Sequence, residues 1–280
     1  MQTVIKRRAH RPFNRAVALV AALALLCASG LVSAASAMCS ARSPAHRVAL
    51  VELYSSEGCN SCPPADAWLG QWKNSGATRS VVPLALHVDY WNGLGWTDRF
   101  SQHRFTERQQ TLTDLAGGHT IYTPEVFVGG RELRTWSQQD SFQSRVDKLI
   151  AEPAQANIAL DIKPQPGGAL DLAARFDSRT AESAARLDAY VAVYENALSS
   201  QVGAGENRGA TLHHERVVRQ WIGPVPLVGG KLQIRRDIRL DSADASANAN
   251  PSVDKFGVVA FVENAATGDV LQVADLPLCH

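Results

Sequence analysis

The sequence predicts an α/β domain followed by a β-rich, sandwich-like domain, and three observations lead to this fold class. Two short apolar runs, 46–54 and 80–88, are each followed by a stretch with helical periodicity. A segment rich in proline and glycine, 153–168, then interrupts this pattern. Beyond it, short alternating runs are separated by turn residues, a spacing typical of β-sandwiches. The predicted domains are therefore 38–152 and 169–280, with 153–168 as a linker or hairpin.

The first domain is expected to have the element order β-α-β-α-β-β-α. The continuous apolar run HRVALVELY (46–54) suits a strand that is buried on both faces of a sheet. The next helix starts near Cys62, because Pro63 and Pro64 are tolerated in a first helical turn. A Cys-x-x-Cys motif at the first strand-to-helix junction of this order is the thioredoxin arrangement. The elements expected after the second strand are a helix over 98–115, a strand with a hairpin turn over 123–130 and a helix over 136–150.

The second domain is expected to consist of short strands. The runs that predict them are 169–176, 187–194, 211–221, 231–240, 257–262 and 270–276.

Composition limits the classes of function. The chain has 280 residues, of which 45% are hydrophobic and 20% are charged, enough for a sizeable core and too apolar for a disordered protein. The formal net charge is +1, and no extended run of Lys or Arg is present. Since phosphate binding needs a concentrated basic face, no nucleic-acid partner is expected.

The N-terminal residues 1–37 resemble a cleavable signal peptide. Five Lys and Arg side chains precede an apolar stretch, 16–32, and the small residues Ala35-Ser36-Ala37 follow as a cleavage site. The alternative is an uncleaved membrane anchor, because the apolar run approaches the length that spans a bilayer. We expect a periplasmic or secreted protein with no membrane contact after cleavage.

The cysteines of the mature chain form two expected pairs. Outside the cytoplasm thiols meet an oxidising environment. Cys59 and Cys62 are a natural local pair, which leaves Cys39 near the new N-terminus and Cys279 near the C-terminus for a structural disulfide. The alternative for Cys39 and Cys279 is two free thiols on frayed ends.

Cys59 and Cys62 are the predicted catalytic pair. Thiol–disulfide exchange needs a thiolate nucleophile and a second thiol that resolves the mixed disulfide. The start of a helix lowers the pKa of the first thiol, so Cys59 is the predicted nucleophile and Cys62 the resolving thiol. The alternatives are a static disulfide or half of a metal site.

The other candidate functional residues are histidines and an aspartate that follows one of them. His87 and Asp89 lie two residues apart at a strand end, so both side chains are expected on one face beside the cysteines, where they tune the thiolate or act as a base. Alternatively, Cys59, Cys62 and His87 bind copper or zinc, or His87 and Asp89 simply satisfy the local backbone. His213 and His214 alternate in a strand and are predicted to be surface or edge residues.

Four segments, together with the expected helix that contains Arg108 and Gln109, resemble a known family. VELYSSEGCNSCPPADAWL (51–69), HVDYWNGLGWTDRF (87–100), YTPEVFVGG (122–130) and VYENALSSQVGAGENRGATLHHERVV (193–218) look like the secreted bacterial family called domain of unknown function 1223. The resemblance implies a thioredoxin-like fold and redox chemistry, without an established substrate. From the wider thioredoxin superfamily it implies a cis bond before Pro124, substrate pairing at the Thr123 backbone, and a proton-transfer role for Glu52. The alternative for Glu52 is a carboxylate that faces solvent.

The leading hypothesis is therefore an exported thiol–disulfide oxidoreductase that acts on protein thiols or disulfides in the periplasm. It needs no cofactor besides its redox-active disulfide. The alternatives are a periplasmic copper- or zinc-binding protein and a non-catalytic binding module with a structural disulfide.

Overall fold

The computed structural model describes residues 2–3, 38–74, 80–165, 169–179, 186–241 and 253–279. The expected signal peptide, 1–37, lies outside the described residues apart from residues 2 and 3. Backbone contacts group residues 36–280 into one compact unit. In the part of the chain that is described, no helix has the length and apolar character needed to cross a bilayer.

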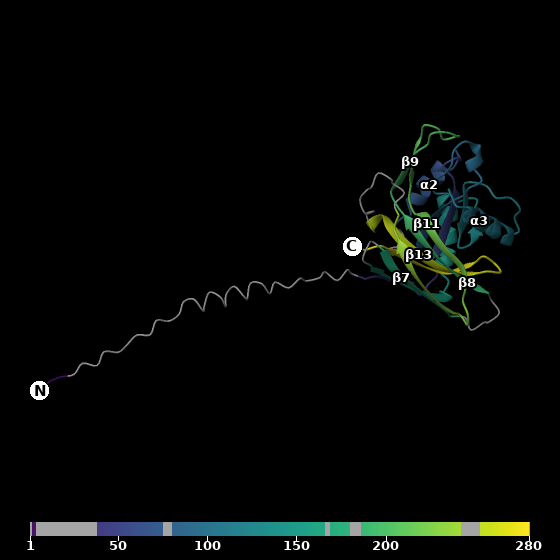
Figure 1. The fold of residues 1–280 in the computed structure, drawn as a ribbon. Coiled ribbons are helices and arrows are strands. Elements are labelled where there is room, and N and C mark those ends of the chain that lie inside the picture. Colours follow the sequence, from purple (N-terminus) through teal and green to yellow (C-terminus); the bar gives the residue numbers. More distant parts are fainter. Residues whose placement is uncertain are drawn as a thin grey trace. The chain divides into compact units, whose positions relative to one another are not determined.

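The centre of this unit is a mixed sheet of eight strands in the order β14-β13-β8-β11-β3-β2-β4-β5 (Figure 1). β3 runs parallel to β2 and β11, and the other pairs are antiparallel. All residues of β2, β3 and β8 are buried, as expected for strands covered on both faces. The strands are β2 (Ala49–Ser55), β3 (Val81–His87), β4 (Glu125–Val128), β5 (Arg131–Glu132), β8 (Leu187–Glu195), β11 (Val217–Pro226), β13 (Phe256–Asn264) and β14 (Val270–Pro277).

The predicted fold class, a thioredoxin-like α/β domain followed by a β-rich sandwich-like domain, is wrong. β11 lies between β3 and β8, so early and late strands share one large sheet in a β-rich molecule. The order of elements from β2 to the helix at Gln139–Ile150 does follow the expected β-α-β-α-β-β-α pattern. The error arises because an apolar run indicates that a strand is buried, but not which strand lies beside it.

A second, antiparallel sheet covers part of the large one. It contains β1 (Cys39–Arg42), β6 (Ala156–Pro164), β7 (Ala169–Ser178) and β12 (Lys231–Arg239) in the order β1-β6-β7-β12. Ile158 and Leu172 of this sheet share a hydrophobic core with Val191 and Val258 of the large sheet. A disulfide between Cys39 and Cys279, the pair expected from the sequence, joins the start of β1 to the segment after β14.

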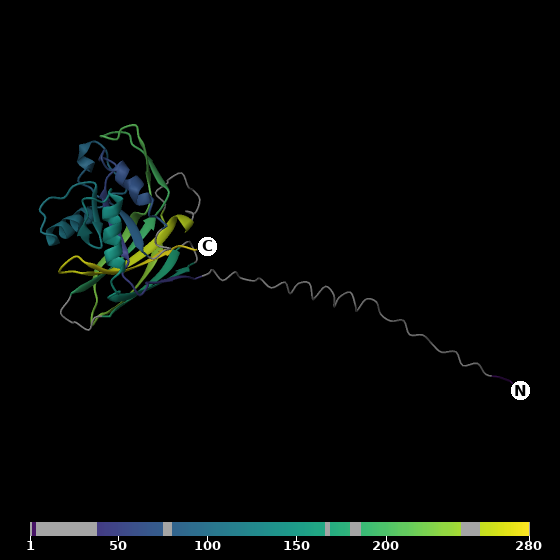
Figure 2. The ribbon, with the colours of Figure 1, turned by 180° about the vertical axis from the view of Figure 1, so that it is seen from behind.

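Three helices cover the two faces of the large sheet around β2. α2 (Pro63–Gly70) and α4 (Gln139–Ile150) pack with Val51 and Leu53 on one face. α3 (His103–Leu115) packs with Leu50 and Tyr54 on the other face. Figure 2 shows α4 as the upright teal helix. The alternation of β2 thus separates its side chains between two cores, which decides what each of them can reach.

A small hairpin, β9 (Leu198–Gln201) and β10 (Thr211–His214), lies beside α2 (Figure 1). The side chain of Lys73, just after α2, forms an ion pair of 2.6 Å with Glu215, just after β10. The hairpin lies along α2, because His214 Nδ1 is also 3.7 Å from Asp66 in the first turn, and Asn207 in the loop 202–210 donates a hydrogen bond to the Cys59 carbonyl oxygen.

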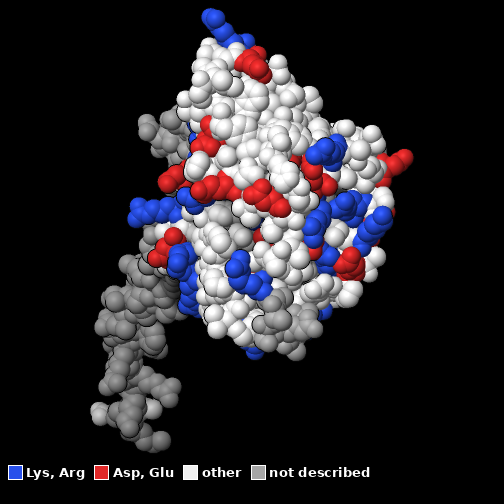
Figure 3. Space-filling view, turned by 90° about the vertical axis from the view of Figure 1, so that its right-hand side faces the viewer, with Lys and Arg blue, Asp and Glu red and all other residues white. Residues whose placement is uncertain are grey.

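Charged side chains are mixed on the face shown in Figure 3. Groups of Lys and Arg are separated there by Asp and Glu.

Candidate functional site

The Cys-x-x-Cys motif lies at the junction of β2 and α2. Cys59 and Cys62 form a disulfide, and Cys62 is the N-cap residue of α2. Pro63 and Pro64 occupy the first two helical positions, where a missing N–H group leaves no intrahelical hydrogen bond unmade. The cysteines therefore lie at the positive end of the helix dipole.

The segment around Pro124 lies next to Cys59. The bond between Thr123 and Pro124 is cis, and the Thr123 carbonyl oxygen is 3.8 Å from the Cys59 sulfur. The indole N–H of Trp91 donates a hydrogen bond of 2.8 Å to the Thr123 hydroxyl. The structure thus brings together Cys59, Cys62, Thr123 and Pro124.

The loop 202–210 is hydrogen-bonded to the backbone around Cys59. The Asn207 side-chain amide donates hydrogen bonds of 2.9 Å to the carbonyl oxygens of both Glu57 and Cys59. The Glu206 carboxylate accepts a hydrogen bond from the backbone N–H of Asn60. Both cysteines are completely buried, with 0% exposure. A reaction at Cys59 therefore requires movement of the residues that cover it.

Glu52 is not brought to the cysteines. Its carboxylate accepts hydrogen bonds of 2.6 and 3.1 Å from Arg108 of α3, which also binds Glu263 at 2.8 Å. Arg108 lies over the rings of Tyr190, Trp221 and Phe261. Glu52 is thus part of a buried ion-pair group on the α3 face, and it does not face solvent.

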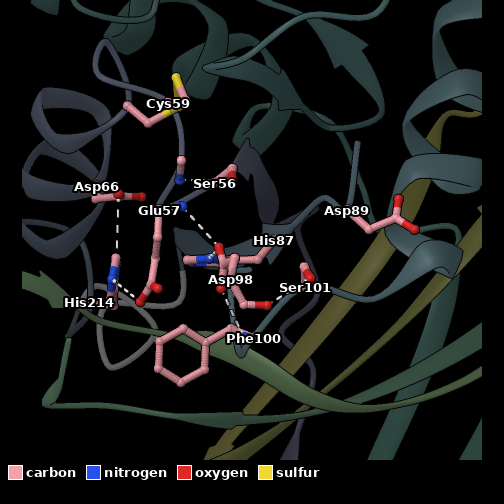
Figure 4. A network of polar contacts seen from close by, with 12 residues as sticks. Ser56, Glu57, Cys59, Asp66, His87, Asp89, Asp98, Phe100, Ser101 and His214 are labelled. Atoms are coloured by element: carbon pink, nitrogen blue, oxygen red, sulfur yellow. Dashed lines mark hydrogen bonds and ion pairs between the residues drawn. A yellow bond between two sulfur atoms is a disulfide. The ribbon is translucent and has the colours of Figure 1, made fainter. Parts of the chain in front are cut away.

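Five ionisable side chains form a buried polar cluster under the start of α2: Glu57, Asp66, His87, Asp98 and His214 (Figure 4). They come from the turn after β2, from α2, from the end of β3, from the loop before α3 and from the end of β10. Phe100 packs at ring distances of 5.4 and 5.5 Å from the two imidazoles, which are 5.0 Å apart. Elements far apart in sequence therefore converge on this cluster.

His87 and Asp98 form the shortest contact in the cluster. His87 Nδ1 is 2.6 Å from an Asp98 carboxylate oxygen, and that oxygen also accepts the backbone N–H of Glu57. Burial lowers the pKa of His87, but the charge and hydrogen bond of Asp98 outweigh burial and raise it to about 9. Burial likewise opposes ionisation of Asp98, yet the charge of His87 holds its pKa below the usual range.

His214 lies between two carboxylates. Its Nε2 is 3.3 Å from Glu57 Oε1, and its Nδ1 is 3.7 Å from Asp66 Oδ2. Burial raises the pKa of Glu57, but hydrogen bonds, chiefly from His214, outweigh burial and lower it. The pKa of Asp66 is raised by its burial, which exceeds the opposing charges of His214 and His87.

Asp89 points away from His87, as Figure 4 shows. Its carboxylate accepts a hydrogen bond of 2.6 Å from the Thr106 hydroxyl and lies 2.9 Å from His103 Nδ1. The expected face shared by His87 and Asp89 does not form, because β3 ends at His87 and strand alternation ends with it.

The possible ligand atoms near His87 are not those of the cysteines. Within the described residues, one group of potential metal-binding side chains includes His87, and it contains Asp66 and His214. Cys59 and Cys62 are outside that group and are bonded to each other. The structure therefore does not gather the expected alternative set of Cys59, Cys62 and His87.

Sequence reasoning missed the role of His214. Strand alternation does place His213 and His214 on opposite sides, and His213 is exposed. His214 is not a surface residue, since only 2% of it is exposed. Asp66 gave no signal either, because an acidic side chain in the first turn of a helix is already explained by the helix dipole.

Solved structures share this fold. A crystal structure of an Agrobacterium tumefaciens protein is 25% identical, with a TM-score of 0.58, and the match covers 84% of this chain and 99% of that one. HBP35 of Porphyromonas gingivalis is 16% identical with a TM-score of 0.58, covering 84% of this chain and 76% of that one.

The amino-acid sequence of this chain matches no curated protein. Residues 50–263, well over half of the chain, match a family described as protein of unknown function DUF1223. This stretch contains the Cys-x-x-Cys motif, the segment around Pro124 and all five residues of the buried polar cluster. The chain belongs to the DUF1223 family.

Proposed function

We propose that this protein is an exported thiol–disulfide oxidoreductase that exchanges the Cys59–Cys62 disulfide with protein thiols and disulfides. The observation that carries the proposal is the position of Cys59, at the start of α2 and 3.8 Å from the carbonyl oxygen of Thr123. A sulfur at a helix start is a good leaving group and a stabilised thiolate. The neighbouring backbone at Thr123 and Pro124 offers a place for an extended substrate segment.

The exchange proceeds through two successive thiol–disulfide reactions. A substrate thiolate attacks the Cys59 sulfur, a new sulfur–sulfur bond forms, and the Cys59–Cys62 bond breaks with Cys62 leaving as a thiolate. A second substrate thiolate then attacks the substrate sulfur of this mixed disulfide and releases Cys59. Two electrons pass from the substrate dithiol to the cysteine pair, and the reverse sequence reduces a substrate disulfide. No other cofactor takes part.

Glu52 has no part in this proposal, because its carboxylate is engaged by Arg108. The loop 202–210 acts as the cover that opens before exchange, since the described state leaves Cys59 with no exposed surface. His87 influences the pair only through the cluster below the start of α2.

Two features support a location outside the cytoplasm. The chain carries two disulfides, which persist in oxidising compartments. Residues 1–37 have the composition of a signal peptide. We infer a periplasmic or secreted protein.

The redox potential tests this proposal. The mature protein is equilibrated with glutathione buffers of known potential, its thiols are alkylated, and each disulfide is mapped by mass spectrometry. We expect a Cys59–Cys62 potential above about −300 mV, while Cys39–Cys279 stays oxidised as an internal reference. A Cys59–Cys62 pair that resists reduction as strongly as Cys39–Cys279 would show that the bridge is structural.

A trapping experiment identifies the partners. In Cys62→Ser the resolving thiol is absent, so mixed disulfides between Cys59 and substrate proteins accumulate in cells. The matched control is Cys59→Ser, which leaves Cys62 as the single thiol of the motif. Equal trapping by both variants would contradict the assignment of Cys59 as the attacking residue.

A further inference from the structure

We propose that Asp66, His87 and His214 bind a divalent transition-metal ion of the zinc class beneath the start of α2. This site goes beyond the proposed thiol chemistry and does not depend on it.

The geometry of the three side chains suits a small ion. One ligand atom from each lies within 4.8 Å of the other two, and His214 Nδ1 is 3.7 Å from Asp66 Oδ2. Ligands bound at 2.0–2.1 Å in a tetrahedral site are about 3.4 Å apart. Small rotations of side chains therefore bring these atoms to coordination distance.

Each histidine has a carboxylate from outside the ligand set beside one of its ring nitrogens. Asp98 is 2.6 Å from Nδ1 of His87, which leaves Nε2 directed into the cluster. Glu57 is 3.3 Å from Nε2 of His214, which leaves Nδ1 on the side of Asp66. A carboxylate on one imidazole nitrogen and a metal on the other is the usual arrangement of histidine ligands. His87 follows this arrangement through its contact of 2.6 Å with Asp98, whereas His214 has Glu57 beside its Nε2 at ion-pair distance, without hydrogen-bond geometry.

The atoms that face the site lack partners. His87 Nε2, His214 Nδ1 and Asp66 Oδ1 are buried and have no hydrogen-bond partner among the described residues. A buried polar atom without a partner costs about 1–3 kcal/mol. Three such atoms belong to side chains from three separate elements whose ligand atoms lie within 4.8 Å of one another, and this indicates a ligand that binds all three side chains.

The donor set defines the class of metal. Two imidazole nitrogens and one carboxylate oxygen suit zinc and other first-row divalent ions, whereas calcium and magnesium prefer oxygen ligands alone. The ion would join α2, β3 and β10 at one point and so fix the segment that carries Cys62.

Metal binding is measured on the mature chain with both disulfides intact. The protein is stripped with a chelator in mild urea, refolded with Zn²⁺ or Co²⁺, dialysed, and its metal content determined by mass spectrometry. We expect one ion per chain, with visible Co²⁺ absorption bands of nitrogen and oxygen coordination and no thiolate charge-transfer band. Failure of the wild-type chain to retain a stoichiometric ion would overturn the proposal.

The variants test the ligand assignment. His214→Gln and Asp66→Asn should each weaken Zn²⁺ binding at least tenfold in competition with a chelator, and Glu57→Gln should weaken it 10- to 100-fold as an orienting partner. His213→Gln is the matched control, because His213 is on the same strand but exposed. Unchanged binding in His214→Gln, or equal loss in His213→Gln, would contradict the assignment.

A reduced sample separates this site from a cysteine site. If Co²⁺ gains a thiolate charge-transfer band on reduction of Cys59 and Cys62 and binds only then, the ligands are the cysteines and the proposal fails. If His214→Gln does not fold, the Co²⁺ spectrum of the folded wild-type chain still decides between the two ligand sets. Loss of metal binding would leave the redox potential of Cys59–Cys62 measurable, so the two proposals fail separately.

Discussion

The carboxyl group of Glu125, directly after Pro124, is almost fully buried, with 1% exposure. Burial is the main cause that raises its pKa, to about 7, although the amide of Gln109 donates a hydrogen bond of 2.6 Å to it. The folded protein therefore keeps a proton on Glu125 at pH values where the unfolded chain has lost it.

This difference predicts a loss of stability as the pH rises. Below the unfolded pKa of 4.5 both states are protonated, and between 4.5 and about 7 the folded state binds more protons, so the free energy of unfolding falls. The full loss is about 3 kcal/mol above pH 7. Between pH 5 and pH 8 the free energy of unfolding of Glu125→Gln, measured with urea, should therefore fall less than that of the wild-type chain. Glu107→Gln is the control, because Glu107 is exposed. If both variants change the pH dependence of the unfolding free energy equally, the prediction is wrong.

Gly130 is expected to tolerate no side chain. Its φ is +84°, and a Cβ atom there would lie 1.7 Å from the carbonyl oxygen of Gly268. Gly130→Ala should therefore lower the free energy of unfolding by more than about 2 kcal/mol, measured with urea. At Gly117 φ is +77° with nothing within 4 Å, so Gly117→Ala should cost about 1 kcal/mol. Equal losses of unfolding free energy in the two variants would show that the backbone near Gly268 moves to accommodate the added Cβ atom.

At the scale of elements, the loop 202–210 is expected to limit access to the disulfide, because it is hydrogen-bonded to the segment around Cys59. Asn207→Ala removes two hydrogen bonds to the segment around Cys59. Opening should become easier by about 1–2 kcal/mol, so reduction of Cys59–Cys62 by a small thiol should be roughly tenfold faster. Thiol release followed by alkylation measures this rate, with exposed Arg208→Ala as the control from the same loop. An unchanged rate in Asn207→Ala would mean that another segment limits access.

Local elements were predictable where the chain itself carries the signal. The two prolines after Cys62 locate the start of α2, and the continuous apolar runs locate β2 and β3. These patterns depend on residues close in sequence, so they predict local structure without knowledge of the contacts with the rest of the chain.

Contacts between distant elements were not predictable from the same patterns. Alternation separates His213 from His214, but whether His214 meets solvent or the buried polar cluster depends on how the hairpin of β9 and β10 packs on α2. Likewise, the alternation of β2 places Glu52 opposite Val51 and Leu53, while its partner Arg108 comes from α3. Periodicity predicts on which face of a strand a side chain lies, but it does not predict which residue that side chain contacts.

For the whole molecule, the Cys39–Cys279 disulfide closes the longest loop. The two cysteines are 240 residues apart, and such a cross-link stabilises by about 5 kcal/mol in the chain-entropy treatment. The double variant Cys39→Ser, Cys279→Ser should lose several kcal/mol of unfolding free energy in urea. The Cys59–Cys62 disulfide closes a loop across a sequence separation of only 3, so replacing both cysteines by serine should cost less. The opposite ranking would contradict this view of the two bridges.

The position of β11 in the large sheet also affects synthesis of the protein. β3 has β2 on one side, and its other neighbour, β11, pairs with it at Val217, more than 130 residues later in the chain. During elongation the first half of the sheet therefore has an apolar edge without a partner, and such an edge is prone to aggregate. Pairing across this sequence distance also makes folding slow. We therefore expect fragments of this chain that end before β11 to aggregate, whereas the complete chain covers this edge.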